Sequence, residues 1–186
     1  MNVSLLSADG RGLAPERQAS AETGGHEDRA IRLDRIDRRI LRELQADGTI
    51  SLARLADRVG LSQTPCWKRV QRLEQSGVIT QRVALVDPSK VSLGLTAFVS
   101  VAAMDHTSAW RDTFDRATAA LPEIVEVWRT AGEADYLLKV VVRDLSSFDA
   151  FYRRLVAAVE FKNVSSQLAL ERVSHTTALP IPSDES

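Results

Sequence analysis

The spacing of apolar residues changes once along this chain of 186 residues, and the change limits the possible folds. Between about residues 33 and 76, apolar residues recur with the 3.6-residue period of a helix, in three short stretches. From about residue 93, strand-like apolar runs are interleaved with two helical stretches. We therefore expect a small helical domain followed by an α+β domain.

The first two helices have clear start and stop residues. Asp34 can cap the first, whose apolar residues keep helical spacing as far as Gly48. Ser51 can cap the second, which ends at Gly60. Both helices are short, so they need a third element to bury their apolar sides.

The third helix is predicted in "LSQTPCWKRVQRLEQSGVI", residues 61–79. Ser62 is the expected N-cap, with its hydroxyl accepting from the backbone of Thr64. Pro65 falls in the first turn, where a missing N–H is tolerated. The residues expected to face inward are Cys66, Val70 and Leu73.

The outward face of this helix combines amide and hydroxyl groups near its start with cations further along. Such groups suit base edges in a major groove and phosphates. Residues 34–90 carry eleven Lys/Arg against seven Asp/Glu, whereas residues 91–186 carry nine against thirteen. A helix-turn-helix that binds double-stranded DNA is therefore expected. The candidate contacts are Ser62, Gln63, Thr64, Pro65, Trp67, Lys68, Arg69, Gln71 and Arg72.

A structural alternative applies to the same helix. Its charged face could simply be solvated, as on any amphipathic helix. Arg69 could serve as an ion-pair partner within the domain, and Trp67 could fold back as a half-buried core residue. Gln63, Thr64 and Lys68 are then the stronger candidates for DNA contact.

The remaining chain predicts β-α-β-β-α-β, the order of a ferredoxin-like domain. Its elements are a strand in "LTAFVSVAAM", a helix marked by Trp110 and Phe114, strands in "IVEVWRT" and "DYLLKVVV", a helix capped by Ser146, and a strand in "VSSQLALERV". A strand is also expected in "VITQRVALVDP" before this domain, and a short edge strand in "TTALPI" at its end. The strands carry apolar residues on both faces, which predicts a homodimer formed sheet to sheet.

Two motifs resemble those of the leucine-responsive/asparagine-regulator (Lrp/AsnC) family of prokaryotic transcription regulators. They are "LSQTPCWKRVQRLEQSGVI" and "TAGEADYLLKVVV", and "TTALPI" resembles the family's usual ending. The resemblance covers roughly residues 33–182. It implies a winged helix-turn-helix, a linking strand and a ferredoxin-like effector domain that assembles dimers into octamers or similar rings. It also implies sequence-specific regulation of amino-acid metabolism genes in response to an amino acid.

The resemblance places effector contacts in "AGEADY", between two strands. A glycine permits close backbone approach, and a carboxylate can bind the ammonium of an amino acid. The candidate effector contacts are Gly132, Glu133, Asp135, Tyr136, Ser165 and Ser166. The structural alternative is a plain hairpin turn with solvated carboxylates.

Other classes of protein find little support in the sequence. We find no catalytic constellation, no phosphate-binding glycine loop and no Cys/His cluster with metal spacing in the sequence. We therefore expect neither an enzyme nor a metal site. An amino-acid effector is the only small molecule expected. Cys66 is the single cysteine and no apolar run could span a bilayer, so we expect a cytoplasmic protein with no membrane partner. Because the protein is expected to bind DNA, we also expect it to be associated with the nucleoid. An architectural DNA-binding protein with little sequence preference is the alternative function.

These predictions divide the chain as follows: a disordered extension at 1–31, a helix-turn-helix domain at 32–82 with its core at 52–76, a linking strand or hinge at 83–92, a ligand-sensing and oligomerisation domain at 93–182, and a tail at 183–186.

Overall fold

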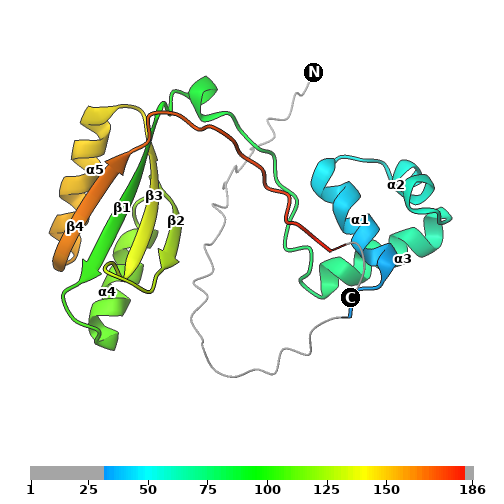
Figure 1. Cartoon of the computed structure of the whole chain (residues 1–186), viewed down its shortest axis with the longest axis horizontal. Coiled ribbons are helices and arrows are strands. Elements are labelled where there is room, and N and C mark those ends of the chain that lie inside the picture. The colour runs from blue at the N-terminus through cyan, green and yellow to red at the C-terminus, as the bar shows by residue number, and fades with distance from the viewer. Residues whose placement is uncertain (1–31, 183–186) are drawn as a thin grey trace, which may run out of the picture. The chain divides into compact units, whose positions relative to one another are not determined.

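The computed structural model describes residues 32–182, so the predicted extension and tail lie outside the described residues. The described chain forms two compact units (Figure 1). The helical unit comprises residues 32–93 and 169–182, and the sheet unit comprises residues 94–168. Within residues 32–182, no helix has the length and apolar character needed to cross a membrane.

The helical unit contains α1 (Arg35–Ala46), α2 (Leu52–Val59) and α3 (Gln63–Gln75). Asp34 caps α1 in a capping box with Asp37, and Ser51 caps α2 by accepting from the backbone of Arg54. Gly60 ends α2 with a φ of 75°, a left-handed conformation that glycine adopts without strain. The two predicted caps and the stop at Gly60 are therefore confirmed, whereas α1 ends at Ala46 with Asp47 as its C-cap, just before the predicted stop at Gly48.

The three helices share one apolar core. Cys66 is fully buried in it, and burial raises the pKa of its thiol, as expected for a small core residue. The inward side of α3 is confirmed, since Val70 and Leu73 are also buried. The buried apolar residues of this core are Ile40, Leu41, Ile50, Leu55, Ala56, Val59, Cys66, Val70 and Leu73.

Ser62 occupies the N-cap position of α3, but its side chain makes no capping hydrogen bond. The predicted bond to Thr64 is therefore wrong. A capping side chain bonds the N–H of the second or third helical residue. Pro65 is the third residue of α3 and has no N–H, which removes one of those two donors.

The predicted strand after α3 is not formed. Residues 80–87 have no regular structure, and a 3-10 turn follows at Pro88–Val91. Val83, Leu85 and Val86 are 63%, 69% and 64% exposed. A strand needs a neighbouring strand to satisfy its backbone hydrogen bonds, and the described residues supply none there.

The predicted edge strand in "TTALPI" is also absent, because this segment binds α1 instead. The Leu179 N–H donates to Gln45 Oε1 at 2.6 Å, and Gln45 Nε2 donates to the Leu179 carbonyl at 3.3 Å. Ile181 packs against the core of the helical unit. Two hydrogen bonds and one apolar anchor thus attach the segment to the outside of α1.

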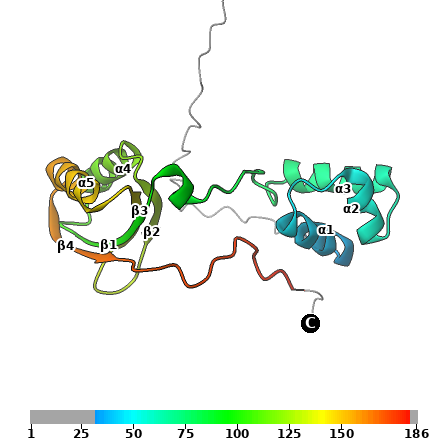
Figure 2. The same cartoon turned by 90° about the horizontal axis from the view of Figure 1, so that it is seen from above.

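The sheet unit has the predicted β-α-β-β-α-β order. Its elements are β1 (Leu95–Ala103), α4 (Ser108–Ala119), β2 (Ile124–Arg129), β3 (Tyr136–Val142), α5 (Leu145–Ala158) and β4 (Phe161–Leu168). The strands form an antiparallel sheet in the order β2-β3-β1-β4. Figure 2 shows α4 and α5 on the same face of that sheet, so the ferredoxin-like prediction is confirmed.

Two boundaries differ from the predicted ones. Asp144, not Ser146, is the N-cap of α5, because its carboxylate accepts from both the Ser147 N–H and the Ser146 hydroxyl. The fourth strand is shifted towards the N-terminus, since it spans Phe161–Leu168 whereas the sequence predicted it over residues 164–173. Phe161 is drawn into the sheet by the aromatic cluster of Trp110 and Phe114, to which its ring lies edge-on.

The two faces of the sheet differ in how they are covered. In β3, Tyr136, Leu138, Val140 and Val142 are buried beneath the helices, while the alternate residues are only half-buried. On the face away from the helices, Phe98 is 37% and Trp128 60% exposed. That face therefore leaves large apolar side chains in water.

Candidate DNA-binding surface and ligand pocket

The start of α3 presents polar groups to solvent. Gln63, Thr64, Pro65 and Lys68 are all exposed. Since the inward side of α3 is anchored in the core, these side chains project from a fixed helix. This is the arrangement that the major-groove prediction requires.

Trp67 has an intermediate position. It is 50% exposed and lines a groove with Leu44 and Leu52. Part of its ring is therefore in contact with the helical unit, and part faces water.

The two arginines of α3 are paired within the helical unit. Arg69 Nη1 lies 2.6 Å from Asp34 Oδ2 and 2.8 Å from Asp37 Oδ1. Arg72 Nη2 bonds the other oxygen of Asp37, a carboxylate that is completely buried. These ion pairs fix α3 against the start of α1, so the structural alternative for Arg69 is satisfied in this structure, while DNA contact by either arginine stays a prediction.

The pKa values follow from these contacts. Partial burial raises the pKa of the Asp34 carboxyl, but hydrogen bonds from the Asp37 N–H and from Arg69 outweigh it, and the net pKa lies below its usual value. The hydrogen bond to Asp34 in turn raises the pKa of Arg69.

Gln71 is half-buried, and its side-chain amide donates to the Glu74 carboxylate at 2.9 Å.

The β2–β3 hairpin contains the second predicted site. Gly132 has a φ of 149°, a conformation that residues with a Cβ rarely adopt. Asp135 holds the hairpin against β1, since its N–H donates to the Val101 carbonyl at 2.8 Å and its Oδ2 accepts from the Ala103 N–H at 2.8 Å. The Asp135 carboxylate is therefore fixed in place by backbone contacts.

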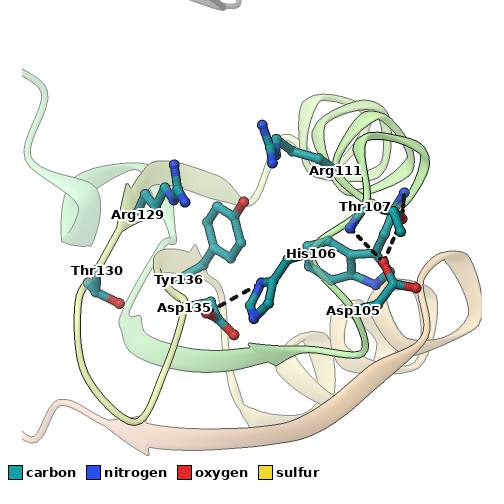
Figure 3. A pocket seen from close by; sticks show the side chains of 9 residues that line it. Asp105, His106, Thr107, Arg111, Arg129, Thr130, Asp135 and Tyr136 are labelled. Atoms are coloured by element: carbon teal, nitrogen blue, oxygen red, sulfur yellow. Dashed lines mark hydrogen bonds and ion pairs between the residues drawn. The ribbon is translucent and has the colours of Figure 1, made fainter. Parts of the chain in front are cut away.

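A pocket of about 210 Å³ opens beside this hairpin on the side of the sheet covered by α4 and α5 (Figure 3). One wall comes from the loop after β1 and the start of α4, namely Asp105, His106, Thr107, Trp110 and Arg111. The other comes from the base of the hairpin, namely Arg129, Thr130, Asp135 and Tyr136. Its inner surface is rigid because the ring of Tyr136 packs on Phe114 with centroids 4.4 Å apart.

The structure brings only part of the predicted effector site together. Asp135 and Tyr136 line the pocket, whereas Gly132 and Glu133 lie exposed on the hairpin outside it. Ser165 and Ser166 lie on β4, where they pair with Ser100 and Val99 of β1. The strand β4 forms the opposite edge of the sheet from the hairpin. Within one chain, therefore, the two serines do not join this pocket.

Sequence reasoning missed the cationic residues of the pocket. Arg129 follows Trp128 directly before "TAGEADY", and Arg111 follows Trp110 at the start of α4. Both were hidden because nothing in their local pattern distinguishes a pocket arginine from a solvated one. They come together only in the fold, where Arg129 pairs with Tyr136 in the sheet and the Trp110 ring of α4 contacts Tyr136.

A helix-turn-helix unit joined to a sheet unit with a small polar pocket defines a DNA-binding transcription regulator with a ligand-binding domain. Residues 96–179 match the family model of the Lrp/AsnC ligand binding domain, and residues 33–80 match that of a winged helix-turn-helix DNA-binding domain. The chain belongs to the Lrp/AsnC family, as its motifs predicted.

Individual relatives agree with this assignment. The DNA-binding transcriptional activator DecR of Escherichia coli (strain K12) is 48% identical over 80% of this chain and 99% of its own. An AsnC family transcriptional regulator from Agrobacterium tumefaciens is 49% identical, with a TM-score of 0.77, over 80% of this chain and 97% of that chain. A transcriptional regulator from Neisseria meningitidis, solved as a complex with L-Met, is 34% identical, with a TM-score of 0.76 over the same shares.

Proposed function

We propose that this protein regulates genes of amino-acid metabolism by binding an operator through α3 and an amino acid at the β2–β3 hairpin. The observation that carries the proposal is the exposed polar start of α3, with Gln63, Thr64 and Lys68 on a helix fixed in position by its core and ion pairs. The L-Met complex of the Neisseria relative supports an amino acid as the class of effector. DNA as partner implies action at the chromosome, in the cytoplasm.

The proposed DNA contacts are those of the exposed α3 face. Gln63 and Thr64 would read base edges, while Lys68 and the exposed part of Arg72 would bind phosphates. Ser62, Pro65, Trp67, Arg69 and Gln71 complete the surface as supporting contacts. In this proposal residues 32–82 form the DNA-binding domain, residues 83–92 the hinge, and residues 93–182 the ligand-sensing domain.

A homodimer is part of this proposal. Exposed apolar residues lie on the bare sheet face, including Phe98 and Trp128, and on the segment with Val83 and Leu85. Patches of this kind are rarely left in water. Assembly of dimers into an octamer would also allow Ser165 and Ser166 of one copy to approach the hairpin of another, which a single chain does not permit.

Fluorescence anisotropy with a labelled upstream-region DNA tests the proposal on the full chain. We expect log K to fall with log salt concentration by roughly 0.9 for each phosphate neutralised, and an amino acid to change the operator affinity. Equal competition by operator and bulk DNA would favour the architectural alternative. Affinity that does not depend on salt, or on any amino acid, would contradict the proposal.

A further inference from the structure

Two arginines in the pocket have no partner within residues 32–182. Arg111 extends from α4 and Arg129 from the last residue of β2, and neither guanidinium makes a hydrogen bond or an ion pair with the described residues. Arg69, Arg72 and Arg154, in contrast, all bond carboxylates. Two free guanidinium groups on different elements, facing one cavity, form a ready binding site for carboxylates.

Tyr136 adds a third polar group on the same side. Its residue is only 9% exposed, and its ring lies between β3 and the aromatic residues Trp110 and Phe114, which fixes the direction of the hydroxyl. Figure 3 shows this hydroxyl on the side of the pocket where both guanidinium groups lie. Arg129 and Tyr136 are direct cross-strand partners, so their spacing is set by the sheet.

The opposite side of the pocket carries a carboxylate. Asp135 uses Oδ2 to accept from the Ala103 N–H at 2.8 Å, while Oδ1 faces His106 Nδ1 at 3.9 Å. His106 is largely exposed, with 77% of its side chain in solvent, so a ligand ammonium can take its place beside Oδ1. Asp105, the other carboxylate in the lining, already accepts from the Thr107 N–H and hydroxyl.

The pocket volume restricts the ligand to a small molecule. The volume of the pocket is about 210 Å³. This is smaller than the roughly 300–1,000 Å³ typical of pockets for drug-sized ligands. An amino acid fits this volume.

We propose that this pocket binds an acidic amino acid, with its two carboxylates on Arg111, Arg129 and the Tyr136 hydroxyl, and its ammonium on Asp135. The inference rests on the proposed function, for which it names the class of effector. A neutral amino acid has one carboxylate, which both guanidinium groups and the Tyr136 hydroxyl would have to share, as Arg69 and Arg72 share the carboxylate of Asp37. A second carboxylate pairs both, and a site built to bond a polar group discriminates against ligands that lack it.

Isothermal titration of the full chain tests the proposal. L-glutamate and L-aspartate are compared with L-glutamine, L-asparagine, L-leucine and L-methionine. We expect at least one acidic amino acid to bind tenfold or more tightly than every neutral one. Arg111→Gln and Arg129→Gln should each weaken that binding tenfold or more, whereas Arg116→Gln, on α4 but outside the pocket lining, should leave it unchanged.

A second pair of measurements tests the orientation of the ligand. Asp135→Asn keeps an oxygen for the Ala103 N–H and loses only the charge. It should weaken binding of the acidic amino acid tenfold or more, while binding of succinate, which has two carboxylates and no ammonium, should change less than twofold. Equal losses for both ligands would overturn the assignment of the ammonium to Asp135.

The possible failures can be told apart. Tighter binding of a neutral amino acid, or arginine variants that bind as the unaltered chain does, would overturn the acidic ligand. The proposed function would survive that result if the neutral amino acid changed operator affinity. Binding of an acidic amino acid that leaves operator affinity unchanged would support the pocket and overturn the effector-dependent regulation.

Discussion

Two pairs of arginines, one in each unit, differ in what the chain provides for them. Arg69 and Arg72 in the helical unit both bond the buried carboxylate of Asp37, so their charges hold α3 against α1. Arg111 and Arg129 in the sheet unit bond no carboxylate of the described residues, although Asp105 and Asp135 line the same pocket. The difference teaches that an arginine is structural when a carboxylate of its own domain bonds it directly, and is available to a ligand when none does.

The largest effect, on the free energy of unfolding, is expected from removing the carboxylate of Asp37. Asp37→Ala deletes a buried carboxylate shared by two guanidinium groups and the capping box of α1. Because Arg72 is half-exposed, we expect a loss of about 2–4 kcal/mol, below the upper end for fully buried pairs. Urea unfolding followed by circular dichroism measures it. The matched control is Arg111→Gln, which should change the unfolding free energy by less than about 0.5 kcal/mol. Equal losses for the two variants would remove the distinction between the two pairs of arginines.

The next effect concerns operator binding, where Gln63 and Lys68 of α3 are expected to differ in what they contact. Gln63→Ala should cost about 1–3 kcal/mol of operator binding and relax preference at one base position, because an amide can read a base edge. Lys68→Ala should weaken all sequences alike and reduce the salt slope by about 1. Anisotropy titrations at several salt concentrations separate the two. A salt slope unchanged in Lys68→Ala would show that this side chain contacts no phosphate.

An effect of similar size, on stability instead of DNA binding, is expected in the hairpin. Gly132→Ala places a Cβ at a φ of 149° and should cost about 1–3 kcal/mol through backbone strain, although open space surrounds the position. Gly48→Ala is the control, since Gly48 has no positive φ and an added Cβ would have an ordinary contact at 3.8 Å. Thermal unfolding compares them. Similar midpoints for both variants would mean that the hairpin relaxes without cost.

The smallest effect at neutral pH concerns Asp144. Hydrogen bonds from Ser147 and Ser146 lower the pKa of its carboxyl from 3.8 to about 2. Its contribution to stability is therefore present above pH about 4 and is lost as the pH falls towards about 2. Asp144→Asn keeps a good cap, so it should unfold like the unaltered chain at pH 7 and lose less stability between pH 4 and 2. Acid titrations of both chains, followed by circular dichroism, would coincide if this carboxyl had its usual pKa.

The helices could be predicted from the sequence because their signals are local. Asp34, Ser51 and Gly60 act on neighbours within a few residues, and all three have the predicted roles. The strand predicted through Val83 and Leu85 failed for the opposite reason, since a strand depends on a partner elsewhere. Apolar alternation alone does not supply that partner.

The candidate sites follow the same rule. The exposed start of α3 could be predicted from the helical period within one short stretch. The pocket could not, because it joins residues near 105–111 to residues near 129–136 through the hydrogen bond of Asp135 to the end of β1 and the ring contact of Trp110 with Tyr136. Asp135 was found because its motif is recognisable, whereas Arg111 and Arg129 belong to no motif.

The attachment of Leu179 and Ile181 to α1 has a consequence for limited proteolysis. The exposed segment with Val83 and Leu85 is an obvious place for a protease to cut. A single cut there would break the chain once, yet the N-terminal fragment would still be held by the C-terminal one, through the hydrogen bonds of Leu179 to Gln45 and the packing of Ile181 on the helical core. A nicked molecule would separate into two bands under denaturing conditions and migrate as one species under native conditions.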